Sequence, residues 1–173
     1  MADPVTEFEA YREELLELLG DDDPLDVLAQ TPRKIEERLK DSRESVLSKR
    51  PGEGAWSVKE VIGHLGDSEW VYGYRMRMML SHDAPEIAGY DQDVMVRGMS
   101  HNERPISMLL EELRRTRGLN LDLYRRTRGP AWERYGQHAE RGAESVDLSV
   151  RLLAGHDRRH LAQIERTLDA VTD

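Results

Sequence analysis

The sequence predicts an all-α protein, a four-helix bundle with two long connecting loops, in a single domain covering residues 1–173. Good helix formers dominate the composition, chiefly Leu, Arg, Glu and Ala. Apolar residues recur at helical spacing along the chain, whereas the apolar alternation typical of strands is scarce. No internal repeat is present, which argues against the alternative of an α-solenoid.

Turn-forming residues divide the first part of the chain into two helices. The first apolar stripe starts at Val5 and stops before Gly20, a residue type that commonly ends helices. The second starts at Pro24 and extends to about Leu47, and Thr31-Pro32 is a point at which it either continues or breaks in two.

The later helices have clearer start signals. Ser57 is followed three residues later by Glu60, which predicts a capping box at a helix start. Pro105 opens the next helix. The expected helices cover about residues 58–81, 105–127 and 146–171, and the long connections between them are 82–104 and 129–145. Connections of this length are often functional.

Composition excludes several classes of function. The formal charge is −9, from 25 basic and 34 acidic residues, and an acidic surface disfavours nucleic-acid binding. With no cysteine, the chain has neither a thiolate nucleophile nor a Cys-ligated zinc site. The acidic N-terminus does not resemble a signal peptide, and no apolar run approaches the roughly 20 residues of a membrane span. We therefore expect a cytoplasmic protein with a small-molecule substrate.

Two histidines in the last predicted helix indicate a metal site. His156 and His160, in "GHDRRHLAQI" (155–164), share a helix face with Leu153 and Ile164. Imidazoles at this spacing lie about 5–6 Å apart at Cβ and can converge on one ion. His64 lies near the apolar stripe of the 58–81 helix and is the third candidate, since three imidazoles leave open positions for water or substrate.

The alternative is that these are core histidines satisfied by hydrogen bonds, without a metal. The motif is also not that of a metalloprotease, because Asp157 follows the first histidine where HExxH has Glu. The remaining histidines, His82, His101 and His138, fall in the long connections, and we expect them to be solvated or packed within the loops.

Three ordered motifs resemble the DinB-like superfamily, close to its YfiT-type branch. They are "GEGAWSVKEVIGHLGDSEWVYGYR" (53–75), with a Trp-Ser helix entry and a His-Leu pair, "APEIAGYDQD" (84–93), with a Tyr-Asp pair, and the terminal HxxxH helix "GHDRRHLAQIERT" (155–167). The resemblance runs from about residue 30 to 168. Two positions depart from it: "HAE" (138–140) replaces an HPE-like turn, and Val94-Met95 replaces a Trp after the Tyr-Asp pair.

The resemblance implies a four-helix bundle in which His64, His156 and His160 hold a divalent metal. We expect zinc or nickel, with iron, cobalt and manganese as alternatives. It also implies a homodimer and a low-molecular-weight thiol, such as bacillithiol or mycothiol, as cosubstrate. We expect the substrate pocket to be lined by Trp56, Tyr72, Tyr90 and Gln163.

Three functions fit these expectations. The leading hypothesis is a thiol S-transferase in which the metal lowers the pKa of the thiol, with Asp67 or Asp91 as base or orienting group. The second is a metal-dependent hydrolase that activates water, for which Asp67 and Asp157 are the candidate bases. The third is a non-catalytic stress-response protein that binds a metal or ligand.

Overall fold

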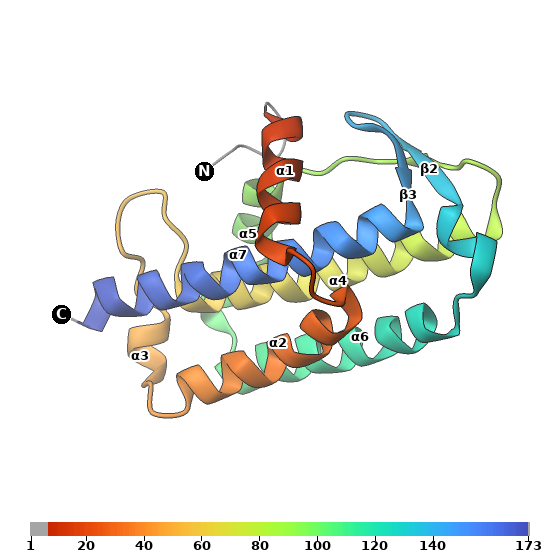
Figure 1. Cartoon of the computed structure of the whole chain (residues 1–173). Coiled ribbons are helices and arrows are strands. Elements are labelled where there is room, and N and C mark those ends of the chain that lie inside the picture. Colours follow the sequence, from red (N-terminus) through yellow and green to blue (C-terminus); the bar gives the residue numbers. More distant parts are fainter. Residues whose placement is uncertain (1–6, 173) are drawn as a thin grey trace.

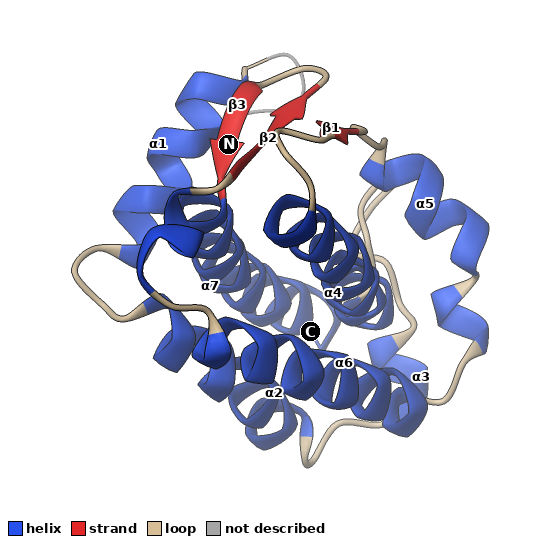
Figure 2. Cartoon of the chain, turned by 90° about the vertical axis from the view of Figure 1, so that its right-hand side faces the viewer, coloured by secondary structure: helices blue, strands red, loops and turns tan. Residues whose placement is uncertain are grey.

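Four long helices form a bundle in the computed structural model, which describes residues 7–172 (Figure 1). They are α2 (Pro24–Leu39), α4 (Val58–Ser81), α6 (Ile106–Arg126) and α7 (Val146–Thr172). Seen along the bundle, α4 packs between α6 and α7, and α2 contacts α6 and α7 from the other side (Figure 2). The predicted four-helix bundle is confirmed.

A further helix, α1 (Phe8–Leu19), crosses over α7 outside the bundle (Figure 1). Its buried face, which includes Tyr11 and Leu15, packs against Leu152 of α7. The two backbones approach closely at Gly155, where a Cβ atom would overlap the carbonyl oxygen of Leu15. Glycine at this position therefore allows α1 to lie against the part of α7 that carries His156.

The second helix continues through Pro32, so the alternative of a break at Thr31-Pro32 is wrong. A proline inside a helix cannot donate to the carbonyl four residues earlier, which here belongs to Leu28. That carbonyl instead accepts a hydrogen bond of 2.7 Å from Nη1 of Arg117 on α6. The helix ends at Leu39 rather than extending to Leu47, and a short helix, α3 (Glu44–Leu47), follows separately.

The two long connections contain regular structure, including a small sheet that the sequence pattern did not predict. The first holds β1 (Glu86–Ile87), α5 (Gln92–Met99) and η1 (His101–Glu103); the second holds η2 (Gly129–Glu133), β2 (Tyr135–His138) and β3 (Gly142–Ser145). The strands form one sheet, in which β1 pairs parallel with β2 and β2 pairs antiparallel with β3. This small sheet covers one end of the α4–α7 pair (Figure 2).

The predicted start of α4 is confirmed in detail. The Ser57 hydroxyl accepts from the backbone N–H of Glu60 at 3.2 Å, and the Glu60 carboxylate accepts from the N–H of Ser57 at 2.9 Å. This capping box fixes the first turn of the helix whose next turn carries His64. Within residues 7–172, no helix has the length and apolar character needed to cross a membrane.

Two glycine-to-alanine substitutions, expected to change the free energy of unfolding in opposite directions, test the contact between α1 and α7. Gly155→Ala should lower the free energy of unfolding by about 1–3 kcal/mol, because the added methyl group forces the two backbones apart. Gly118→Ala, on the exposed face of α6 with no atom near its Cβ, should raise it by up to about 1 kcal/mol. Urea unfolding of both variants measures the difference; equal stabilisation by both would show that α1 does not pack this closely.

Candidate metal centre

Three buried imidazoles meet between α4 and α7. His64 comes from α4, and His156 and His160 come from consecutive turns of α7; each ring is at least nine-tenths buried. Nε2 of His156 lies 2.9 Å from Nε2 of His64 and 3.0 Å from Nε2 of His160. The sequence-predicted trio is thus brought together around one point, and within residues 7–172 it is the one cluster of potential metal ligands of this kind.

Hydrogen bonding fixes the tautomer of His160. Its Nδ1 lies 2.8 Å from Oε1 of Gln163, which can only accept, so Nδ1 carries the proton. Nε2 of His160 therefore presents a lone pair to Nε2 of His156. A partner that holds the second nitrogen of a ligating histidine in this way orients the ring and increases its basicity. Gln163, predicted as a pocket residue, thus supports the cluster directly.

Hydrogen bonds among the rings cannot satisfy all three Nε2 atoms. Because His160 offers no proton there, a proton on Nε2 of His156 can be donated fully to only one of its two neighbours. A cation at the centre accepts all three lone pairs at once. Metal–nitrogen bonds of about 2.0–2.1 Å place neighbouring ligand nitrogens roughly 3 Å apart, close to the observed separations. The donor set therefore fits a divalent metal.

Electrostatics keep the cluster neutral. Burial lowers the pKa of all three histidines, because a charged imidazolium loses its hydration inside the protein. For His64 and His156 the other imidazoles lower the pKa further. For His160, the bond to Gln163 opposes burial, and the pKa is lowered to about 4. Neutral imidazole is the form that binds metals, so the site is ready for an ion at neutral pH.

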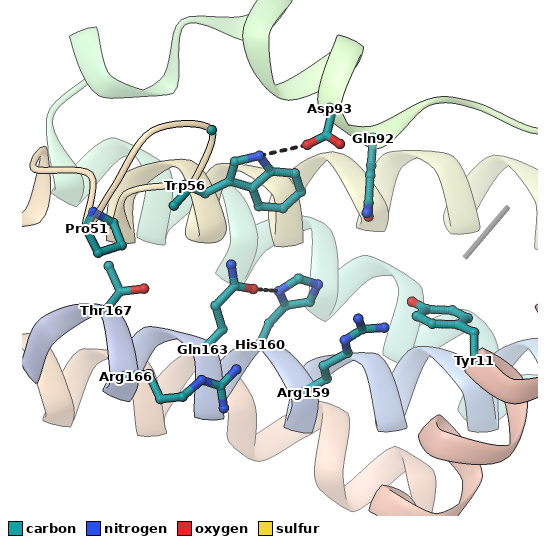
Figure 3. Close-up of a pocket in the computed structure, with 12 residues that line it drawn as sticks. Tyr11, Pro51, Trp56, Gln92, Asp93, Arg159, His160, Gln163, Arg166 and Thr167 are labelled. Carbon is teal, nitrogen blue, oxygen red and sulfur yellow. Dashed lines mark hydrogen bonds between the residues drawn. The ribbon is translucent and has the colours of Figure 1, made fainter. Parts of the chain in front are cut away.

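An open cavity of about 470 Å³ adjoins the cluster on the His160 side (Figure 3). The Trp56 ring lies nearly parallel to the His160 ring, with centroids 6.2 Å apart, and its Nε1 donates to Asp93 at 2.9 Å. Gln163, one of the residues expected to line a substrate pocket, also lines this cavity. Sequence reasoning did not identify other members of its wall, which are Tyr11, Gln92, Asp93, Arg159 and Arg166.

A smaller cavity of about 70 Å³ lies on the other side, against His156. The predicted pocket residues Tyr72 and Tyr90 line it. It also contains Tyr11, Arg75, His138 and Arg141, which bring α1, α4 and the small sheet together. The histidine cluster therefore stands between two cavities, and the four predicted pocket residues are divided between them.

The carboxylates proposed as bases have other partners. Asp67 accepts from Nε2 of His101 at 2.8 Å, and Asp91 caps α5 by accepting from the N–H of Val94. Neither lines the two cavities beside the cluster. Asp157 is fully buried and binds Arg117 through both oxygens, at 2.6 and 3.0 Å. The geometry thus gives these three carboxylates structural contacts.

Two of the remaining histidines are core residues rather than solvated ones. His101 is 1% exposed and its ring occupies the space above Gly63, while His138 is 4% exposed in β2. His82 is exposed, as expected. The sequence did not distinguish them, because no periodic pattern marks the burial of residues in short strands and turns.

Comparison with known proteins agrees with this geometry. A solved structure of YfiT from Bacillus subtilis, described as "a probable metal-dependent hydrolase with an unusual four-helix bundle topology", matches with a TM-score of 0.77 at 23% identity and covers 83% of both chains. A relative in Oceanobacillus iheyensis is 27% identical over 77% of both chains, and one in Halalkalibacterium halodurans is 28% identical over 70% of this chain and 71% of that protein. Both carry the name "putative metal-dependent hydrolase". The family model of the DinB superfamily matches residues 28–164, most of the sequence, and the chain belongs to that superfamily.

Proposed function

We propose that this protein is a divalent-metal-dependent S-transferase that joins a low-molecular-weight thiol to a small electrophilic substrate. The observation that carries the proposal is the placement of the three-histidine cluster between two cavities, one open and one small. Such an arrangement gives each of two reactants its own site beside the same metal. The names of the relatives support metal dependence, and the choice of a thiol comes from the resemblance to the DinB-like superfamily, with which two cavities beside one metal site are compatible.

The carboxylates proposed as bases, Asp67 and Asp157, are already engaged, and Asp93 of the open cavity accepts from Trp56, which supports a thiol nucleophile over an activated water. When bound, a divalent metal acts as a Lewis acid that lowers the pKa of a thiol or of water at its open positions. A thiol coordinated in this way loses its proton outright, whereas Asp67 and Asp157 are already held by His101 and Arg117. The chain has no cysteine, so the reacting sulfur has to come from a cosubstrate.

The residues of the chain would then bind and orient the reactants. The neutral imidazoles of His64, His156 and His160 would hold the metal, and Gln163 fixes the ring of His160. The Trp56 ring forms a flat wall beside His160 on which the thiol cosubstrate can lie. In the reaction, the sulfur forms a bond to the electrophilic carbon, the leaving group departs with its electron pair, and the thiol proton passes to solvent.

A hydrolase is the second candidate, favoured by the names of the relatives. The same three neutral imidazoles could serve to activate water, since water on a histidine-bound zinc ion has a pKa of about 7. Both candidates need the metal, and they differ in whether a thiol is consumed. A protein that only binds a metal for stability would do neither.

Metal content tests the site itself. The purified protein should bind about one divalent metal ion per chain, and His64→Ala, His156→Ala and His160→Ala should each weaken zinc affinity by about 100-fold or more, because each removes one of three ligands. Elemental analysis and competition with a chromophoric chelator measure this. His82→Ala, at an exposed histidine, is the control and should leave affinity unchanged. Unchanged affinity in all three cluster variants would exclude the site.

Zinc affinity should also depend on pH in an unusual way. Ordinary histidines have a pKa of about 6.5, so protons would begin to compete below that value, by up to about 1,000-fold per pH unit for three ligands. Here the folded-state pKa values are lowered, to about 4 for His160. The neutral form therefore persists on acidification, and affinity should stay nearly constant from about pH 7.5 to 6 and fall only as the pH approaches 4. A steep loss of affinity just below pH 6.5 would contradict this electrostatic account.

Conjugation of thiols to monochlorobimane distinguishes the two enzymatic candidates. The zinc-loaded protein is assayed with bacillithiol, mycothiol and glutathione in turn, and with at least one of them it should increase the rate at which the fluorescent conjugate forms. His160→Ala should lower that catalysed rate by at least about 100-fold. Ester hydrolysis without thiol is measured in parallel. Hydrolysis with no thiol conjugation would replace the transferase by the hydrolase, and inactivity in both assays with a metal-dependent rise in Tm would leave a binding protein.

A further inference from the structure

The small cavity beside His156 contains a buried positive charge without a partner. Arg75 of α4 is 4% exposed, and its Nη2 donates to the carbonyl oxygen of Ala88 at 2.5 Å. Its Nη1 has no hydrogen-bond partner, and among the described residues no carboxylate lies within ion-pair distance of it. The guanidinium lies only against the rings of Tyr72 and Tyr90, at 5.4 and 5.6 Å. Such burial of an unpaired charge is costly unless a ligand compensates for it.

A second unpaired donor lines the same cavity. The backbone N–H of Glu140 donates to Nδ1 of His138 at 3.2 Å, so a neutral His138 carries its proton on Nε2. That Nε2 is buried and has no acceptor. Burial and the nearby Arg141 and Arg75 lower the pKa of His138 to about 4, which keeps the ring in this neutral form.

A third donor belongs to the histidine cluster. Nδ1 of His156 is also buried without a partner, and it carries the proton whenever Nε2 serves as a metal ligand. Arg75 of α4 and His138 of β2 thus place two unpaired donors around one cavity, and His156 of α7 adds a third when its Nε2 binds a metal. Buried donors without a protein acceptor favour a ligand that supplies one, since each unmade hydrogen bond costs on the order of 1–3 kcal/mol.

The carboxylates nearby do not fill this need. Glu144 is 3.3 Å from Nη1 of Arg141 and accepts from the Ser149 hydroxyl at 2.6 Å, so it neutralises Arg141 rather than Arg75. Glu140 is exposed, and its carboxylate lies over Gly89 at the rim of the cavity. One positive charge, that of Arg75, is therefore left over on the cavity wall.

We propose that this cavity is the binding site for a carboxylate group of the substrate. A carboxylate is a planar acceptor with two oxygens and about four lone-pair positions, which suits one guanidinium and two ring N–H donors. The argument that an anion binds here depends only on Arg75 and His138. The further inference that the bound carboxylate orients the electrophile beside the metal rests on the proposed function.

Acetate titration tests the site directly. Acetate, at constant ionic strength with chloride as the balancing anion, should raise the Tm of the metal-free full-length protein, because it binds the folded state. Arg75→Gln should raise the acetate concentration needed for this shift by about tenfold or more, and His138→Phe, which keeps a ring but removes the donor, should also raise it. Arg77→Gln, an exposed arginine of the same helix outside the cavity, is the matched control and should behave as the unsubstituted protein.

The outcomes separate this proposal from the proposed function. The anion-site proposal would be overturned by an equal acetate response in the unsubstituted protein and in both cavity variants. A response to inorganic phosphate but not to acetate would also overturn it. So would an acetate response seen only in the zinc-loaded form, which would indicate binding to the metal. Acetate binding through Arg75, combined with failure of the protein to bind zinc in the chelator competition, would support the anion site and reject the metal-dependent enzyme.

Discussion

One buried arginine connects the four helices of the bundle. Arg117 of α6 binds Asp157 of α7 through two hydrogen bonds of 2.6 and 3.0 Å, and its Nε lies 2.9 Å from the Glu69 carboxylate of α4. The same side chain donates to the carbonyl oxygen of Leu28 on α2. His64 is one and a half turns before Glu69, and His156 directly precedes Asp157. The contacts of Arg117 therefore fix the relative position of the helices that supply the metal ligands.

This network also explains why buried charged residues and a proline occur inside the helices of the bundle. Two carboxylates share one guanidinium in a dry interior, and burial raises the pKa of Glu69 although Arg117 and Asn120 counteract it. Removal of one member of such a group commonly costs about 3–5 kcal/mol, because the remaining charges lose their compensation. Pro32 removes a backbone donor that would otherwise compete for the Leu28 carbonyl. The proline in α2 and the arginine in α6 are thus complementary features of one contact.

The sequence predicted those parts of the structure that depend on local or periodic signals. The capping box at Ser57 and the HxxxH face follow from spacing alone, His64 is a candidate from its place beside the apolar stripe, and the resemblance joins the three histidines into one ligand set. The small sheet and the continuity of α2 could not be predicted in this way, because each depends on a partner distant in the chain. Arg75 and His138 are unremarkable in sequence and become a site only when α4 and β2 meet. The homodimer and the cytoplasmic location stay predictions.

The contrast between the acidic chain as a whole and the arginines beside the histidine cluster favours small anions as ligands. The chain as a whole carries a formal charge of −9, which disfavours binding of polyanions such as nucleic acids. The two cavities beside the histidines are nevertheless lined by four arginines, Arg75, Arg141, Arg159 and Arg166. Glu144 neutralises Arg141 and Glu14 lies 3.6 Å from Arg159, so the positive charge available to a small anion is chiefly that of Arg75. A small anion can reach this charge in its recessed cavity, whereas a large polyanion would also meet the acidic surface outside it. For the substrate proposed above, this site would select molecules that are both negatively charged and small enough to enter the cavity beside the histidine cluster.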